Sequence, residues 1–142
     1  MITSFRDLEV WKRAHKLVLE VYGLTNPFPR GERFGGVSQI RRAASSIPAN
    51  LAEGYGRRST NELLQFIAIA DGPAEELRYF LMLRKDLRYL SPEDESRLDK
   101  DITAIVQMLA ALPRSLKARQ AGVSRNTARE TRNTKSTMEV GI

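Results

Sequence analysis

The chain has 142 residues, 42% of them hydrophobic, which is enough for one domain with a modest core, and its formal net charge is +6. It has no cysteine, which excludes disulfides and thiolate metal sites and fits a reducing cytoplasm. Charges interrupt the N-terminus, and no stretch approaches the roughly 20 apolar residues of a membrane span. We therefore expect a cytoplasmic protein with no membrane segment.

Apolar residues at steps of three and four predict helices throughout. The first helix is expected over about residues 7–25, with Ser4 or Asp7 as its cap, and Pro27 and Pro29 end it. Its inner side is expected to hold Leu8, Trp11, Leu17, Val18, Val21 and Tyr22. The second helix is expected over about residues 34–55 and contains Pro48, which predicts a kink.

The third helix is expected to begin after a cap at Ser59 or Thr60, with Glu62 in its first turn and an interruption with a bend at residues 71–73. Its predicted inner residues are Leu63, Phe66, Ile67, Ala70, Ala74, Leu77, Leu81 and Leu87. Ser91 and Pro92 open the fourth helix, whose seam is Leu98, Ile102, Ile105, Leu109, Leu112 and Leu116. Four such helices with short turns predict an all-α, antiparallel up-down four-helix bundle over residues 1–117, and no strand.

The C-terminal segment, residues 118–142, is rich in basic and small polar residues and poor in large apolar ones. This composition buries too little apolar surface to offset the entropy of ordering, so we expect a disordered tail. A basic tail can bind nucleic acid through phosphates. It can equally be a solubilising terminus that has no partner.

The second helix carries two stripes of opposite character. An apolar seam runs through Val37, Ile40, Ala44, Ile47 and Leu51. Beside it lies the polar row, which we define as Gln39, Arg42, Ser46, Asn50, Glu53 and Arg57. The polar row is either the solvent-exposed face of an ordinary amphipathic helix or a surface that packs against another subunit. In both cases we expect Asn50 and Glu53 to be structural polar anchors rather than catalysts.

Two motifs on this helix are specific: Gln-Ile-Arg-Arg-Ala at residues 39–43, and Ser-Ile-Pro-Ala-Asn-Leu-Ala-Glu-Gly-Tyr-Gly-Arg at residues 46–57. With them the chain resembles the 23S rRNA intervening-sequence protein family, also called the four-helix-bundle protein family. The resemblance covers about residues 4–117 and includes Phe-Arg-Asp-Leu at 5–8, Val-Trp at 10–11, Phe-Pro at 28–29, Glu-Arg at 32–33 and Glu-Leu at 76–77. Pro73 departs from it, since the family usually has serine there.

The resemblance implies a small antiparallel bundle that assembles as a ring-shaped homopentamer. One branch of the family is the accessory protein of diversity-generating retroelements, which binds a reverse transcriptase and nucleic acid. Together with the two stripes, this predicts a closed homo-oligomer, a pentamer by resemblance, with RNA, DNA or a reverse transcriptase as further partners.

Four arginines are the candidate nucleic-acid contacts: Arg41, Arg42, Arg57 and Arg58. They form two pairs about 24 Å apart along one helix, a spacing that could bracket a phosphate backbone. The alternative is that Arg57 pairs with Glu53 and Arg42 with a neighbouring carboxylate. No base-reading motif occurs, so any binding should be nonspecific in sequence.

Enzyme chemistry has little support in the sequence. His15 is the only histidine, so paired Glu-x-x-His metal sites cannot form, and no phosphate-binding Gly-rich loop occurs. The basic residues around His15 predict that it lies on a solvent-exposed, positively charged face of the first helix. We expect no enzyme, metal or cofactor, and the alternative to nucleic-acid binding is a protein-only scaffold or regulator.

Overall fold

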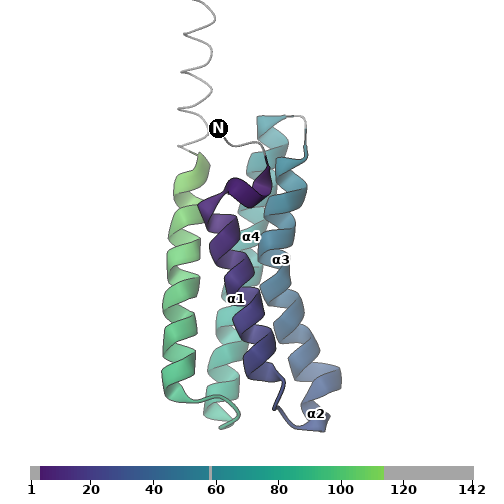
Figure 1. Cartoon of the computed structure of the whole chain (residues 1–142), viewed down its shortest axis with the longest axis vertical. Coiled ribbons are helices and arrows are strands. Elements are labelled where there is room, and N and C mark those ends of the chain that lie inside the picture. The colour runs from purple at the N-terminus through teal and green to yellow at the C-terminus, as the bar shows by residue number, and fades with distance from the viewer. Residues whose placement is uncertain (1–3, 58, 114–142) are drawn as a thin grey trace, which may run out of the picture. The chain divides into compact units, whose positions relative to one another are not determined.

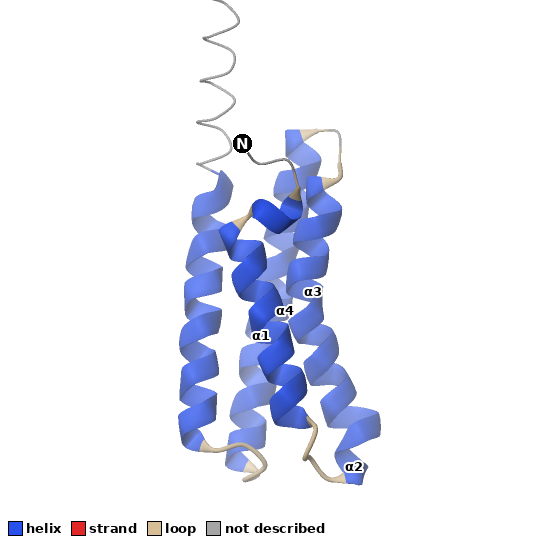
Figure 2. Cartoon of the chain, viewed as in Figure 1, coloured by secondary structure: helices blue, strands red, loops and turns tan. Residues whose placement is uncertain are grey.

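The computed structural model describes residues 4–57 and 59–113, and residues as far as Leu109 belong to one compact unit. All regular elements in these described ranges are helical (Figure 2). Four main helices form a bundle in which each helix runs opposite to the one before it (Figure 1). The predicted all-α bundle is thereby confirmed. The predicted tail, residues 118–142, lies outside the described residues.

The first main helix, α1, spans Glu9–Thr25 and follows a short 3-10 helix, η1, at Phe5–Asp7. The Arg6 N–H donates to Ser4 Oγ (3.2 Å), and the Ser4 N–H donates to the Asp7 carboxylate (3.1 Å). This reciprocal arrangement is a capping box. Ser4 therefore caps η1, and α1 begins without a side-chain cap.

The second main helix begins earlier than predicted, because a short α-helix at Arg30–Glu32 and a π-helical turn precede the regular part of the helix. Short helix α2 at Arg30–Glu32 leads into the π-helix η2 at Arg33–Val37 and then, without a break, into α3 at Ser38–Tyr55. Pro48 lies buried inside α3, which continues on both sides of it. A π-helical turn accommodates one extra residue per turn, which periodicity at 3.6 residues cannot reveal.

The third helix, α4, spans Thr60–Asp86, and the Glu62 N–H donates to Ser59 Oγ (3.1 Å). The expected cap is confirmed, but the expected interruption at residues 71–73 is wrong because α4 passes through Pro73 unbroken. Proline removes only one helical hydrogen bond here, and the buried neighbours Ala70 and Ala74 hold the helix against the core. The last helix occupies residues 92–113, and Ser91 caps it by accepting from the Asp94 N–H (3.1 Å).

The predicted seams of α3 and of the last helix are buried, as far as Leu109. Two predicted inner residues are not: Tyr22 is 43% exposed and Leu87 is 50% exposed. Leu87 follows the end of α4, and the chain reverses at Arg88, whose φ is 67°. Tyr22 is held under an arginine of α3, as described below. Trp11 is half-buried.

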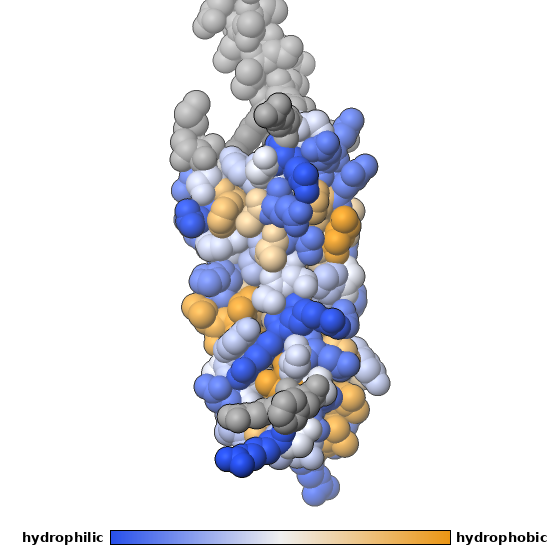
Figure 3. Space-filling view, turned by 90° about the vertical axis from the view of Figure 1, so that its right-hand side faces the viewer, coloured by the Kyte–Doolittle hydropathy of each residue, from blue (hydrophilic) through white to orange (hydrophobic). Residues whose placement is uncertain are grey.

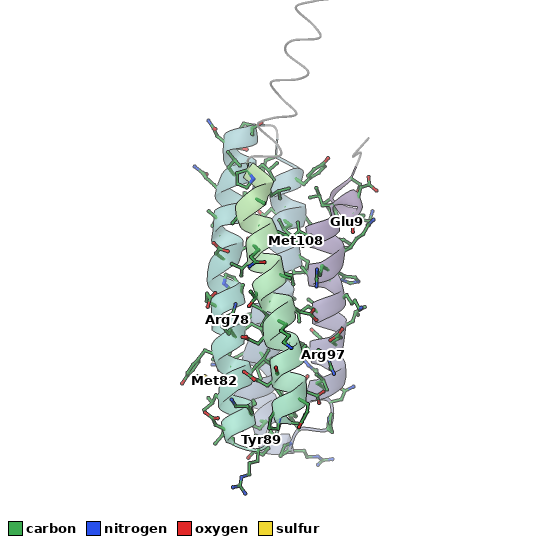
Figure 4. All side chains as sticks on the ribbon, turned by 90° about the vertical axis from the view of Figure 1, so that its left-hand side faces the viewer. Glu9, Arg78, Met82, Tyr89, Arg97 and Met108 are labelled. Atoms are coloured by element: carbon green, nitrogen blue, oxygen red, sulfur yellow. The ribbon has the colours of Figure 1, made fainter. Side chains whose placement is uncertain are left out.

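The order of the helices around the bundle follows from their contacts. α3 packs against both α1 and α4. The last helix closes the ring of helices, since Asp101 pairs with Arg13 of α1 (3.7 Å) and Asp99 pairs with Arg78 of α4. Figure 4 shows α4 and α1 on the two sides of the last helix. α1 and α4 are therefore diagonal to each other.

One buried ion pair joins α4 to the segment before α3. Arg84 Nε lies 2.8 Å from Glu32 Oε2, and Arg84 is only 7% exposed. Gly36 of the π-helix leaves room for this pair, because a Cβ at that position would collide with the ends of both side chains. None of the helices in the described ranges combines the length and apolar composition of a bilayer span.

Candidate nucleic-acid interface

Charge is divided unequally between the two halves of the bundle. The first hairpin, residues 1–58, has ten Lys or Arg and five Asp or Glu, a net charge of +5. The second hairpin, residues 59–109, has six basic and ten acidic residues, a net charge of −4. Since α1 neighbours α3, the excess positive charge lies on the α1–α3 half of the bundle.

A polar groove lies where the C-terminal end of α1 meets the first half of α3. Its volume is about 690 Å³, and we name it the α1–α3 groove. It is lined by Tyr22, Thr25, Asn26, Val37, Ser38, Arg41, Arg42 and Ser45. These residues include two adjacent arginines and no acid, so the groove suits an anion.

Arg41 is held rigidly in this groove. Its Nε donates to Thr25 Oγ1 (3.0 Å) and its Nη2 donates to Asn26 Oδ1 (3.0 Å). Its guanidinium carbon lies 4.4 Å from the centre of the Tyr22 ring, a cation–π contact. The Thr25 hydroxyl is itself anchored, because it is buried and donates to the Val21 carbonyl (2.8 Å). Nη1 takes part in none of these contacts.

Arg42 is exposed at the edge of the groove. Its backbone carbonyl accepts from the hydroxyls of Ser45 (3.2 Å) and Ser46 (2.7 Å). In the part of the chain that the structure describes, no carboxylate lies within ion-pair distance of the Arg42 guanidinium. Its side chain is therefore available to a ligand.

Arg57 lies towards the other end of the second helix and is engaged within the chain. Its Nη2 donates to Glu53 Oε1 (2.9 Å), as the alternative interpretation expected, and its guanidinium carbon lies 5.0 Å from the Phe66 ring centre. Arg58 is outside the described residues. The structure thus brings Arg41 and Arg42 together on one groove and gives Arg57 separate partners.

The polar row lies at the surface of the bundle. Gln39 and Glu53 are exposed, whereas Ser46 and Asn50 are half-buried. The Asn50 amide donates to the Ser46 carbonyl (2.7 Å) within the same helix. Pro48 leaves a different carbonyl, that of Ala44, without its helical donor. Asn50 therefore bonds to the backbone of its own helix, at a carbonyl other than the one that the proline vacates.

Sequence reasoning missed five groove residues: Tyr22, Thr25, Asn26, Ser38 and Ser45. Tyr22 was assigned to the core, and the others had no assigned role. Arg41 reaches Thr25 across 16 positions and Asn26 across 15, so no local spacing links them. The available signal was weak: polar residues at the end of a helix, just before Pro27.

His15 lies at the surface of α1, where the sequence places it. His15 is exposed, and its ring stacks on Trp11 with centroids 5.0 Å apart and an interplanar angle of 9°. Trp11 in turn meets the edge of Phe5 (5.1 Å). Within the described residues, no cluster of three or more His, Cys, Asp or Glu side chains is placed to hold a metal.

Comparison with known proteins gives one family and one fold. The family model described as 23S rRNA-intervening sequence protein matches residues 6–111. A similar solved structure is a protein of unknown function from the S23 ribosomal protein family of Bacteroides thetaiotaomicron. It is 24% identical, the match covers 73% of this chain and 97% of that chain, and the TM-score is 0.65, which supports the fold alone. A search of curated proteins finds no match.

Proposed function

The chain belongs to the 23S rRNA-intervening sequence protein family, and we propose that it is a non-enzymatic, oligomeric bundle that binds the phosphates of nucleic acid in the α1–α3 groove. One observation carries the proposal: Arg41 and Arg42 stand side by side on a groove whose lining contains no acid. Hydrogen bonds from guanidinium groups to phosphate are charge-assisted and strong.

The fixed position of Arg41 favours phosphate binding. Because Thr25, Asn26 and Tyr22 already hold its guanidinium, little side-chain entropy remains to be lost when a ligand binds Nη1. Arg42 adds a second, mobile cation, and Ser38 adds a hydroxyl donor in the same lining. Such donors recognise the backbone and not the bases, so RNA and DNA of any sequence should bind.

Assembly would multiply the positive charge that the protein presents to nucleic acid. We propose a closed homo-oligomer, a pentamer by the family resemblance, in which five chains of +6 would carry about +30. Such a field attracts polyanions, and the affinity for nucleic acid then depends strongly on salt concentration.

Arg57, Arg58 and the basic segment 118–142 would add weaker phosphate contacts. A nucleic-acid enzyme such as a reverse transcriptase is the protein partner that this surface would serve.

A protein-only scaffold is the second candidate. It is favoured by the engagement of Arg41 and Arg57, which already have partners within the chain. In that case the groove would contact a protein, and nucleic acid would not bind at low salt.

Titration of labelled RNA and DNA of unrelated sequences against the full chain, at several salt concentrations, separates the two candidates. Arg42→Ala should weaken binding to every sequence alike and lower the log-log salt slope by about 0.9 on duplex DNA for each lost contact. Lys100→Ala is the matched control, an exposed lysine on the last helix that should change neither value. Absence of binding at low salt, or strong preference for one sequence, contradicts the proposal.

A further inference from the structure

Three aromatic rings contact one another at the N-terminal end of α1. The Phe5 ring of η1 meets the Trp11 ring edge-on, with centroids 5.1 Å apart. The Trp11 ring lies nearly parallel to the His15 ring, with centroids 5.0 Å apart and an interplanar angle of 9°. Figure 1 shows η1 turned across the start of α1, which brings Phe5 to Trp11. We name Phe5, Trp11 and His15 the aromatic stack, in which Trp11 is held between the other two rings.

The aromatic stack ends in a ring that faces solvent. Phe5 and Trp11 are half-buried, whereas His15 is exposed. Among the described residues Trp11 is the only ring in contact with His15, and a parallel arrangement covers one face of a ring. The second face of the His15 ring therefore has no aromatic partner within the described chain. It can accept another flat group, with Trp11 and Phe5 supporting the ring from behind.

Cations border the aromatic stack. The guanidinium carbon of Arg6 lies 5.1 Å from the centre of the first ring, and Lys16 directly follows the last ring in the chain. Both side chains are exposed, and neither forms an ion pair with a carboxylate of the described residues. The nearby acids are engaged, Asp7 in the capping box and Glu9 with Lys12 (3.2 Å). Arg6 and Lys16 are thus available to an anionic ligand.

The aromatic stack and the α1–α3 groove share one flank of α1. Trp11, His15, Val18 and Tyr22 follow one another at steps of four, three and four, which places them along one side of the helix. Tyr22, at the far end of this row, lines the groove and lies under Arg41. The seven positions from His15 to Tyr22 span about 10 Å along the helix axis. One extended ligand can therefore contact both the groove and the stack.

The ligand that fits both sites combines flat rings with negative charges. Figure 3 shows the side of the bundle on which α3 lies, where hydrophobic residues form only separate patches among hydrophilic ones. This side thus offers a protein partner no broad apolar surface. A nucleobase stacks on an aromatic side chain whatever its identity, because every base has a π-face. Only a single strand can turn its bases outwards to expose those faces.

We propose that the aromatic stack is a base-stacking site for single-stranded nucleic acid, in which a base lies on the free face of His15 while Lys16 and Arg6 hold the adjoining phosphates. The inference rests on the proposed binding of nucleic acid and adds a second contact, to the bases. Stacking does not read sequence, so the site remains nonspecific. It gives the protein a preference for strands whose bases are unpaired.

Two strands of equal length and equal charge test the site on the full chain. One is an oligothymidine of about 12 nucleotides, and the other is an abasic strand with the same number of phosphates. We expect oligothymidine to bind about tenfold more tightly at the same salt concentration, because only this strand can stack. His15→Ala should abolish the difference by weakening oligothymidine alone. His15→Tyr, which keeps a flat ring, should preserve it.

Two further variants separate the ring from charge and from exposed aromatic residues in general. Lys16→Ala should weaken both strands by the same factor, since it removes a phosphate contact and no ring. Tyr79→Ala is the matched control, because it removes a ring of α4 that is 54% exposed and should change the affinity for neither strand. Fluorescence anisotropy of labelled strands measures the affinities, and circular dichroism checks the fold.

Trp11 provides an independent readout, because it is the only tryptophan of the chain. Its emission should change when oligothymidine binds and should change much less when the abasic strand binds. A change of equal size with both strands would contradict stacking beside Trp11.

The outcomes separate the stack from the groove. If both strands bind wild type equally, or the difference survives in His15→Ala, the stacking site is overturned, and weaker binding of both strands by Arg42→Ala would still support the groove. If His15→Ala abolishes the difference but Arg42→Ala weakens neither strand, the groove is refuted and the stack stands. Absence of binding by both strands at low salt refutes both proposals.

Discussion

The two hairpins of the bundle share one core but have opposite exteriors. Ile47 of α3 and Ile102 of the last helix are both fully buried, so each hairpin contributes to the interior in the same way. Outside, the first hairpin has a net charge of +5 and the second a net charge of −4. The comparison teaches that burial determines the fold, whereas the net charge of the surface is free to differ in sign between the two hairpins.

The largest effect should come from the shared core. Ile47→Ala and Ile102→Ala should each lower the free energy of unfolding by about 2–5 kcal/mol, because each leaves a cavity among buried side chains. Chemical denaturation of the two variants tests whether the hairpins contribute equally. A loss well below 1 kcal/mol for either one would show that its hairpin is not part of a common core.

The next effect concerns the ion pair that joins the hairpins. Glu32→Gln should destabilise the bundle by about 2–3 kcal/mol, since it leaves Arg84 charged and buried without its partner. Gly36→Ala should have a comparable effect through the collision of its Cβ with the same pair. Thermal unfolding of both variants measures it. If Tm is unchanged in both, the pair does not hold the hairpins together.

Removing a helix cap should lower the free energy of unfolding by an intermediate amount. The loss should be larger in the second hairpin than in the first. Ser59→Ala and Ser91→Ala each remove a hydroxyl that accepts from a backbone N–H, at a cost of about 1 kcal/mol. Both caps belong to the second hairpin. Ser4→Ala should cost less, because Ser4 caps only the short η1 and α1 has no side-chain cap. Equal losses at all three serines would contradict this ranking.

The smallest effect should come from the exposed ion pair of the first hairpin. Glu53→Gln should change the free energy of unfolding by only about 0.2–0.5 kcal/mol, because Arg57 and Glu53 are both well exposed. Measured beside Glu32→Gln, it is the matched test of burial: the same chemical change at an exposed pair and at a buried one. A loss at Glu53 as large as at Glu32 would refute the assignment of the buried pair as the stronger link.

The local signals of the sequence determined the helices and most of their boundaries. Apolar residues at steps of three and four marked the seams, and Ser59 and Ser91 marked two helix starts, because both features act within one or two turns. The local rule that proline interrupts a helix failed at Pro73, where tertiary packing determines the structure. α4 continues through Pro73 because buried alanines on either side keep it against the core.

Only the tertiary structure could decide the candidate site. Arg41 and Arg42 were identified from sequence, but the groove exists because α1 places Tyr22, Thr25 and Asn26 beside Arg41, and the relative rotation and register of two helices are not encoded in either helix alone. The pairing of Arg84 with Glu32, 52 positions apart, depends in the same way on the π-helical turn and on Gly36. Periodicity identifies which face of a helix is buried, whereas the contacts between faces are determined by how all four helices pack together.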